Sequence, residues 1–173
     1  AYGVTYKRRF GEKKAEWQLE LVASEDGMDY EVVTQWDIPG KPNETTLRFL
    51  PDDTMLALVR REGGNRNGWF GAASPPYTEW DWNELADRLG GPNFIILPDG
   101  SMWAGSRLYG QNGAKTTLAR LTRDSYEPVL TLPSGGDCSY PGFVWHEGLL
   151  WMSYYSSHED KTSIYLARIK LAE

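Results

Sequence analysis

The sequence predicts an all-β fold in which four-stranded antiparallel sheets follow one another, as the blades of a β-propeller do. The first observation is the composition. Its 18 Gly and 10 Pro interrupt the 173 residues too often for long helices, and its 8 Trp and 10 Tyr suit short strands. The second is an internal repeat of 47 to 48 residues, because a period of about 40–50 residues is typical of propeller blades.

Three copies of the repeat each predict a β-hairpin. Residues 50–60, 97–107 and 145–155 each contain a tight turn of the Asp or Gly type followed by an apolar strand, and an apolar segment leads into the turn. We expect these hairpins to form the two inner strands of three successive blades. The apolar side chains expected to lie between adjacent sheets are Leu56, Leu58, Ile95, Ile96, Val144, Leu150 and Trp151.

The remaining strand-like segments predict the outer strands of the blades. Residues 17–23 and 30–36 predict the outer hairpin of a preceding blade, and further segments follow the inner hairpins at 68–73, 116–122, 126–132 and 163–171. Together they predict about three and a half blades of a six-bladed propeller. The expected boundaries are a blade remnant over 1–42 and blades over 43–90, 91–138 and 139–173.

Residues 81–89 are the one segment with a helical pattern. Trp82, Leu85 and Leu89 lie on one stripe of a helix, and the pair Gly90-Gly91 would end it. We therefore expect one or two helical turns within a loop at this place.

Both ends of the sequence suggest a piece of a larger propeller. The chain has no initiator Met, residues 4–7 already alternate like a strand, and the last blade lacks an obvious fourth strand. We expect the C-terminal half of a propeller. Open sheet faces and unpaired strand edges are costly in water, so the expected partners are the missing N-terminal half or a second copy of the chain.

Charge and cysteine content exclude several classes of function. The formal net charge is −6 at pH 7 and no basic block is present, so neither nucleic acid nor an anionic membrane surface is an expected partner. No apolar run approaches the ~20 residues that span a bilayer. Cys138 stands alone, and no Cys/His cluster has the spacing of a zinc site. We expect no intrachain disulfide, no metal and no cofactor, and the sequence leaves the cellular compartment open.

Residues 24–30, Ser-Glu-Asp-Gly-Met-Asp-Tyr, carry a resemblance to a known family. They resemble the Asp-box, or BNR motif, of sialidase propellers, Ser-x-Asp-x-Gly-x-Thr-Trp, with one residue missing and Tyr30 in the place of the Trp. The Ser and Asp side chains of such turns bond local backbone N–H groups. The motif indicates a fold and leaves the function open.

One column of the repeat predicts a functional site. Arg60, Arg107 and Tyr155 occupy the same place at the end of the second strand of each hairpin. Because side chains alternate along a strand, equivalent positions in successive blades project alike, and these three are expected to line one end of the central channel. Glu44 lies 16 residues before Arg60 and is expected near the same end. The order Glu, Arg, Arg, Tyr resembles the C-terminal half of a sialidase.

This resemblance implies a role for each residue. Arg60 and Arg107 would clamp the carboxylate of the substrate, Tyr155 would attack the anomeric carbon, and Glu44 would serve as its base. A neutral phenol suits this reaction because the sugar's own carboxylate would repel a carboxylate nucleophile. Tyr154 is a rival for Tyr155, since a one-residue slip in the hairpin would exchange their faces. The family's acid/base Asp and first clamp arginine have no match here, so the fragment alone is expected to be inactive.

Three function classes stay open at this point. The first is a sialidase-like glycoside hydrolase that acts on terminal sialic acid or a related acidic sugar. The second is a propeller that binds carbohydrate without hydrolysing it. The third is a protein-interaction propeller in which the channel residues are only structural. The sequence favours the first class, with an acidic glycan as the expected ligand.

Overall fold

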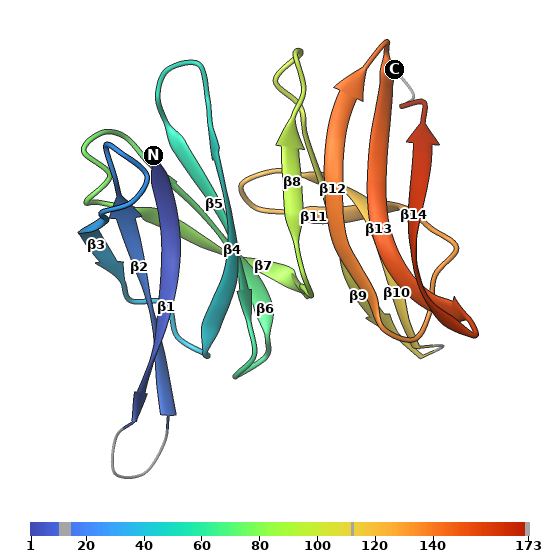
Figure 1. Cartoon of the computed structure of the whole chain (residues 1–173), viewed down its shortest axis with the longest axis horizontal. Helices are drawn as coiled ribbons and strands as arrows, with labels where there is room; N and C mark the ends of the chain where they lie inside the picture. The colour runs from blue at the N-terminus through green and yellow to red at the C-terminus, as the bar shows by residue number, and fades with distance from the viewer. Residues whose placement is uncertain (11–14, 112, 172–173) are drawn as a thin grey trace.

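The computed structural model describes residues 1–10, 15–111 and 113–171, and its regular structure is entirely β (Figure 1). These residues form fourteen strands in four antiparallel sheets and contain no helix. The predicted all-β fold of propeller blades is confirmed. Since the described residues form no helix, they include none that could cross a membrane.

Each sheet consists of strands that are consecutive in the chain. The first sheet contains β1 (Tyr2–Phe10), β2 (Ala15–Ala23) and β3 (Glu31–Trp36). The second contains β4 (Pro42–Phe49), β5 (Met55–Arg61), β6 (Asn67–Ala73) and β7 (Asp81–Arg88). The third contains β8 (Asn93–Ile96), β9 (Met102–Gly110), β10 (Gly113–Leu121) and β11 (Tyr126–Thr131). The fourth contains β12 (Cys138–His146), β13 (Leu149–Glu159) and β14 (Lys161–Ile169).

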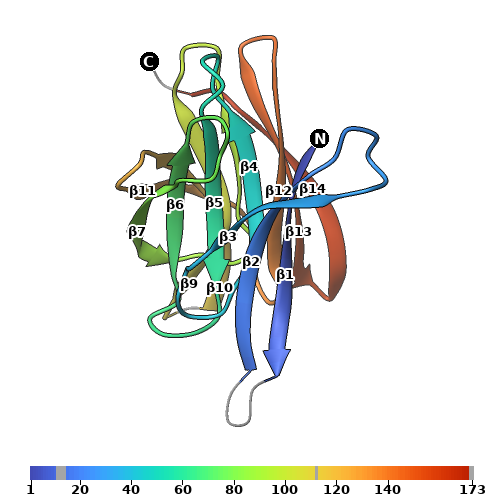
Figure 2. The same cartoon turned by 90° about the vertical axis from the view of Figure 1, so that its left-hand side faces the viewer.

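The four sheets stand in a row, from the first sheet on the left of Figure 1 to the fourth on the right. Figure 2 looks along this row from the side of the first sheet. The strands β4, β8 and β12 each form one edge of their sheet and contact one another in turn. They are the innermost strands of three successive blades. That these sheets belong to a ring of six blades stays a prediction.

The sequence repeat is also a repeat of structure, because the inner turns fix the register of the strands. The N–H of Leu50 donates to the carbonyl of Thr54 (2.9 Å), and the N–H of Leu97 donates to that of Ser101 (2.8 Å). Gly100 supplies the positive φ, 82°, that this turn requires. The same register follows in each sheet, and its cross-strand pairs are Leu58 with Phe70, Gly105 with Leu118, and Ser153 with Leu166.

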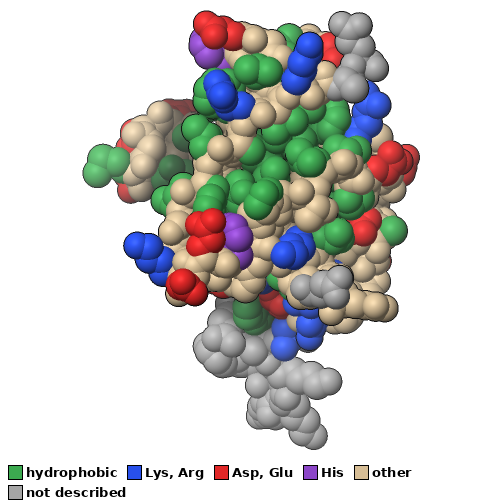
Figure 3. Space-filling view, turned by 90° about the vertical axis from the view of Figure 1, so that its right-hand side faces the viewer, with side chains coloured by type: hydrophobic (Ala, Val, Ile, Leu, Met, Phe, Trp, Pro, Cys, Tyr) green, Lys and Arg blue, Asp and Glu red, His purple; other side chains and the backbone are tan. Residues whose placement is uncertain are grey.

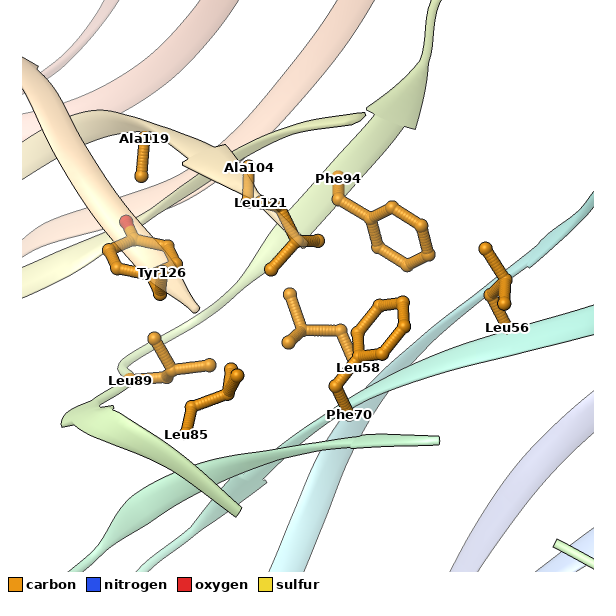
Figure 4. Close-up of a cluster of buried hydrophobic side chains, with 10 residues drawn as sticks. All are labelled: Leu56, Leu58, Phe70, Leu85, Leu89, Phe94, Ala104, Ala119, Leu121 and Tyr126. Atoms are coloured by element: carbon orange, nitrogen blue, oxygen red, sulfur yellow. The ribbon is translucent and has the colours of Figure 1, made fainter. Parts of the chain in front are cut away.

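The sheets pack face to face through apolar side chains. Figure 4 shows the cluster between the second and third sheets, where Phe70 meets Phe94 edge to face with ring centroids 5.9 Å apart. Similar clusters lie between the first and second sheets and between the third and fourth. Fully or partly buried members that the sequence predicted are Leu56, Leu58, Ile95, Ile96 and Leu150.

Two predicted core residues lie elsewhere. Val144 is 59% exposed, and Trp151 is only partly buried, because both belong to the outer face of the fourth sheet, which no described sheet covers. Their repeat position implies burial only where a following sheet packs against that face.

The expected helical turns over residues 81–89 are wrong, because this segment is the strand β7. It pairs with β6, with Asn83 opposite Phe70. Leu85 and Leu89 are both buried in the cluster with Phe70. Residues four apart share a face in a strand as well as in a helix, so these leucines fit both periods. Pairing with the edge of β6 decides in favour of the strand.

The turn at residues 24–29 is closed by two side chains. The Ser24 hydroxyl accepts from the N–H of Gly27 (2.7 Å) and donates to Asp26 (3.0 Å). The Asp26 carboxylate accepts from the N–H groups of Met28 (2.8 Å) and Asp29 (3.0 Å). These bonds, that from Asp29 first, lower the pKa of Asp26 to about 2.

Acid is therefore expected to open this turn only well below the ordinary pKa of an aspartate, ~3.9. A lowered pKa favours the ionised carboxylate, so its stabilising effect is present above pH ~4 and is lost as the pH falls towards about 2. Carbon NMR of the Asp26 carboxyl should show a midpoint near 2 in the folded protein. In urea the same carboxyl should titrate near 4. A folded-state midpoint near 4 would contradict the bonding of the turn.

Candidate functional site

The predicted site residues meet at the end of the sheets that lies opposite the inner hairpin turns. Arg60, Arg107 and Tyr155 lie towards the ends of β5, β9 and β13, and Glu44 lies near the start of β4. Two further side chains, from the loop before β12 and from β12 itself, complete what we call the polar cluster. Its members are Glu44, Arg60, Arg107, Asp137, Tyr140 and Tyr155.

Arg107 holds one half of the polar cluster together. Its Nη2 donates to Asp137 Oδ1 (2.8 Å) and to the Tyr155 hydroxyl oxygen (3.0 Å), and its Nε donates to the carbonyl of Cys138 (2.6 Å). The Tyr155 hydroxyl in turn donates to Asp137 Oδ1 (2.6 Å). A guanidinium, a phenol and a carboxylate are thus in mutual contact.

Arg60 holds the other half. Its Nη1 lies 2.7 Å from Glu44 Oε2, and its Nη2 contacts Glu62. The other oxygen of Glu44 accepts from the hydroxyl of Tyr140. The Tyr140 ring stacks on that of Tyr155, with centroids 5.9 Å apart and planes 24° from parallel. This stack joins the two halves into one cluster.

Burial and hydrogen bonding keep both phenols of the polar cluster neutral. Burial first, and then the hydrogen bond to Asp137, raise the pKa of Tyr155 to about 12, although Arg107 acts in the opposite direction. Burial and the bond to Glu44 likewise raise the pKa of Tyr140. Near neutral pH both hydroxyl groups are donors.

The two arginines are already paired with carboxylates. Burial alone would lower the pKa of Arg60, but the hydrogen bond and charge of Glu44 and the charge of Glu62 raise it overall. Arg107 faces Asp137, and its pKa is raised despite burial by the nearby tyrosines and this carboxylate. An incoming anion would therefore have to compete with these internal partners.

Irregularities in the strand backbone lie next to two members of the polar cluster, Glu44 and Tyr140. The register of β4 shifts between Pro42 and Thr45, on either side of Glu44. The register of β12 shifts between Ser139 and Gly142, on either side of Tyr140. Such bulges re-aim side chains in strands near functional sites. Tyr140 also has a left-handed φ of 48°, which is rare for a bulky residue.

The glycines at residues 90 and 91 leave room for the polar cluster. A Cβ on Gly90 would lie 2.5 Å from the Tyr109 hydroxyl oxygen and 3.1 Å from the Cβ of Arg107. A Cβ on Gly91 would lie 3.2 Å from the Tyr140 ring. The sequence suggested that this pair ends a helix, but its role is to let Arg107 and Tyr140 approach the backbone.

A groove of about 610 Å³ adjoins the polar cluster. Glu44 and Tyr140 belong to its wall, and so do Arg48 and Asn93 on the innermost strands. Arg48 Nη2 donates to Asn93 Oδ1 (2.9 Å), and Asn93 Nδ2 donates to the carbonyl of Pro141 (2.7 Å). The groove therefore offers hydrogen-bonding side chains from the second, third and fourth sheets.

The structure brings all four predicted site residues together but changes two of the expected contacts. The tyrosine hydroxyl that reaches Glu44 is that of Tyr140, and the carboxylate next to Tyr155 is Asp137. Tyr154 faces the other way. Its hydroxyl donates to the carbonyl of Pro133 (2.9 Å) in the core region between the third and fourth sheets. The catalytic and clamping roles of the four residues stay predictions.

Sequence reasoning missed Asp137 and Tyr140. A signal for Tyr140 was present, because the dipeptides Lys41-Pro42, Gly91-Pro92 and Tyr140-Pro141 recur at about the repeat spacing. Each dipeptide lies at or near the start of an innermost strand, and its first residue has a positive φ: 57°, 56° and 48°. No comparable pattern marks Asp137. Among the described residues, no group of three or more His, Cys, Asp or Glu side chains is placed to hold a metal ion.

Comparisons with known proteins support the fold. No family model and no curated protein matches the sequence. The structure is similar to a xylan β-1,4-xylosidase of Bacillus halodurans C-125, with a TM-score of 0.62 and 13% identity over 98% of this chain and 38% of that chain. An endo-1,4-β-xylanase of Bacteroides thetaiotaomicron has a TM-score of 0.62 and 11% identity, over 99% and 72% of the two chains.

A third similar structure is an endo-arabinase of Bacteroides thetaiotaomicron, with a TM-score of 0.55 and 14% identity over 91% of this chain and 72% of that chain. Other similar structures are described as GH43 proteins, among them one of Bacillus licheniformis with 12% identity and a TM-score of 0.62. This chain spans only 38% of the Bacillus halodurans xylosidase. At these identities the likeness shows the fold alone, and this chain shares its β-propeller fold with these structures.

Proposed function

We propose that this chain belongs to a carbohydrate-active propeller and that its glycan site contains the polar cluster and the adjoining groove. The observation that carries the proposal is the convergence of carboxylates, neutral phenols and paired arginines from three sheets on one end of the innermost strands. Hydroxyl-rich ligands need such a mixture of donors and acceptors. The xylosidase, xylanase and arabinase among the similar folds support a glycan as ligand.

The carboxylates of Glu44 and Asp137 could serve as the two catalytic groups of a glycoside hydrolase. Most glycosidases use two carboxyl groups on either side of the scissile bond. Glu44 and Asp137 flank the stack of Tyr140 on Tyr155, and their side chains are 31% and 68% exposed. We assign this pair to the reacting end of the glycan. Arg60 and Arg107 hold the two carboxylates in place.

A second candidate is the sialidase-like reaction on an acidic sugar, with Tyr155 as nucleophile. The contact that favours it is the 2.6 Å hydrogen bond from the Tyr155 hydroxyl to Asp137, which places a base at the phenol. In this reaction Asp137 takes the role that the sequence suggested for Glu44. The carboxylates already paired with Arg60 and Arg107 weigh against a clamp for an acidic sugar, so neutral glycans are the first candidate.

Binding of short oligosaccharides separates these possibilities, and its readout does not require the chain alone to be catalytic. We expect xylo- or arabino-oligosaccharides to shift the amide NMR signals of Gly90 and Gly91, which line the polar cluster. Tyr155→Phe and Glu44→Gln each remove one polar group and should weaken binding about tenfold or more. Glu127→Gln, on the exposed side of β11, is the matched control and should have no effect.

The outcomes distinguish the candidates. Binding of a neutral glycan at Gly90 and Gly91 supports the first proposal. If a sialyl oligosaccharide binds there and the neutral glycans do not, the sialidase-like reaction takes its place. If neither glycan shifts these signals, the polar cluster is structural and the proposed function is wrong.

A further inference from the structure

A second groove lies at the opposite end of the sheets from the polar cluster, between the third and fourth sheets. Its volume is about 400 Å³. It is formed where the turn after β8 and the end of β12 approach the end of β14. The residues used in the argument are Leu97, Trp103, Arg120, Trp145, Lys170 and Leu171.

The walls of this turn-side groove are aromatic and firmly packed. Trp103 comes from β9 of the third sheet and is 8% exposed, and Trp145 comes from β12 of the fourth sheet. Both belong to the apolar packing between the two sheets, together with Leu97 and Leu171. Indole faces held in this way bind the apolar face of a ring at little cost in side-chain entropy.

The rim of the turn-side groove carries two cations, Arg120 and Lys170, that form no ion pair with a carboxylate of the described residues. The Arg120 guanidinium lies over the Trp103 ring, 5.8 Å from its centroid, which is within the limit of about 6 Å for a cation–π contact. Among the described residues, no carboxylate lies within 4.0 Å of Arg120 or Lys170. The Asp99 carboxylate, also at this rim, is bonded to the N–H and hydroxyl of Ser101. These bonds first, and the more distant charge of Arg120 last, lower the pKa of Asp99.

These cations contrast with the arginines of the polar cluster. Among the described residues, Arg60 and Arg107 form ion pairs with Glu44, Glu62 and Asp137, whereas Arg120 and Lys170 form none and lie next to an indole surface, with Asp99 as the one carboxylate among the lining residues of the groove. We therefore expect an anion to bind more favourably at the turn-side groove than at the polar cluster.

We propose that the turn-side groove binds a six-membered ring that bears a carboxylate. The ring packs on Trp145, and the carboxylate lies between the guanidinium of Arg120 and the ammonium of Lys170. A guanidinium suits a carboxylate because its N–H groups match the two oxygens, and the lysine adds a point charge. A uronic acid residue of a glycan has this chemistry, and an aromatic carboxylate has it too.

The test uses the indole N–H signals of Trp103 and Trp145 in NMR titrations. The probes are a glucuronic acid-containing oligosaccharide, a neutral xylo-oligosaccharide of the same length, and benzoate. We expect the uronate to shift the indole signals and the neutral oligosaccharide to leave them unchanged. Arg120→Gln and Lys170→Gln should each raise the dissociation constant about tenfold, since each removes a charged donor.

Arg168→Gln is the matched control. Arg168 also lies over a tryptophan ring, but no second sheet of the described residues faces this pair to form a groove. The Arg168 guanidinium lies 5.6 Å from the centroid of Trp151, at the same register as Arg120 and Trp103. That pair belongs to the outer face of the fourth sheet, so the control should keep full affinity. Glutamine variants of surface cations also avoid the loss of folding that a Trp145→Ala change could bring.

Each result decides the assignment. Benzoate binding without uronate binding would identify the ligand as an aromatic carboxylate. Equal binding of the neutral oligosaccharide at the indoles, or no shift with either carboxylate, would overturn the proposal. Failure here is distinct from failure of the polar cluster, which is read at Gly90 and Gly91.

Discussion

Phe94→Ala is expected to lower the free energy of unfolding by about 3–5 kcal/mol, the usual range for a fully buried phenylalanine. Phe94 is 0% exposed and lies on β8, which has four residues. Its ring packs edge to face on Phe70 at 5.9 Å (Figure 4). The Arg48 guanidinium lies 5.6 Å from the centroid of the same ring. Removing the ring opens a cavity between the second and third sheets and leaves the shortest strand weakly held.

Urea unfolding followed by tryptophan fluorescence measures this effect. The matched control is Val129→Ala on β11, where the side chain is 56% exposed, and its cost should be below about 0.5 kcal/mol. Similar losses for the two variants would mean that the sheets do not pack through Phe94.

The blades could be predicted from the sequence because their turns and strands are local features. Leu50 and Leu97 start the same turn, and the turn sets the register of the strands that follow. The column of Arg60, Arg107 and Tyr155 followed from the same register, since equivalent strand positions project alike. A repeat of sequence therefore carried information on a cluster of side chains from three sheets.

The period of the apolar residues did not predict other features, because these depend on backbone irregularities or on long-range packing. Tyr140 reaches Glu44 through a left-handed φ and a bulge in β12, and Asp137 reaches Tyr155 from a loop. The period of the apolar residues does not encode either geometry. Leu85 and Leu89 were misread as helical because a spacing of four residues fits a strand equally well.

The outer face of the fourth sheet, opposite the third, predicts how this chain associates. Leu166, Ile164 and Val144 are 63%, 83% and 59% exposed, and apolar side chains gather on this face in Figure 3. Phe70 and Leu118 occupy the register of Leu166 in the preceding sheets and are 0% exposed. The repeat has thus placed side chains suited to sheet packing on a face that no described sheet covers.

The first sheet does not offer a complementary surface for this face. One side of its middle strand carries an ion pair between Lys7 and Glu20, at 2.6 Å. Gln35 donates to Glu20 (3.0 Å) and accepts from Gln18 (2.9 Å) beside it. Head-to-tail stacking of two copies would bury these polar groups against apolar side chains, at a cost in desolvation. Two fourth sheets placed face to face bury apolar surface on both sides, in a symmetric pair.

We therefore expect the isolated chain to be a dimer, with a mass of twice 19.6 kDa in analytical ultracentrifugation. The double variant Ile164→Lys/Leu166→Arg places two like charges on each copy of the face and should sediment as a monomer. Val129→Lys introduces a charge on β11 instead and should leave the dimer intact. A wild-type monomer at high concentration, or a double variant that still pairs, would show that this face does not join two copies. Because the expected contact is apolar, and salt screens contacts between exposed charges but not apolar burial, the pairing should persist in high salt.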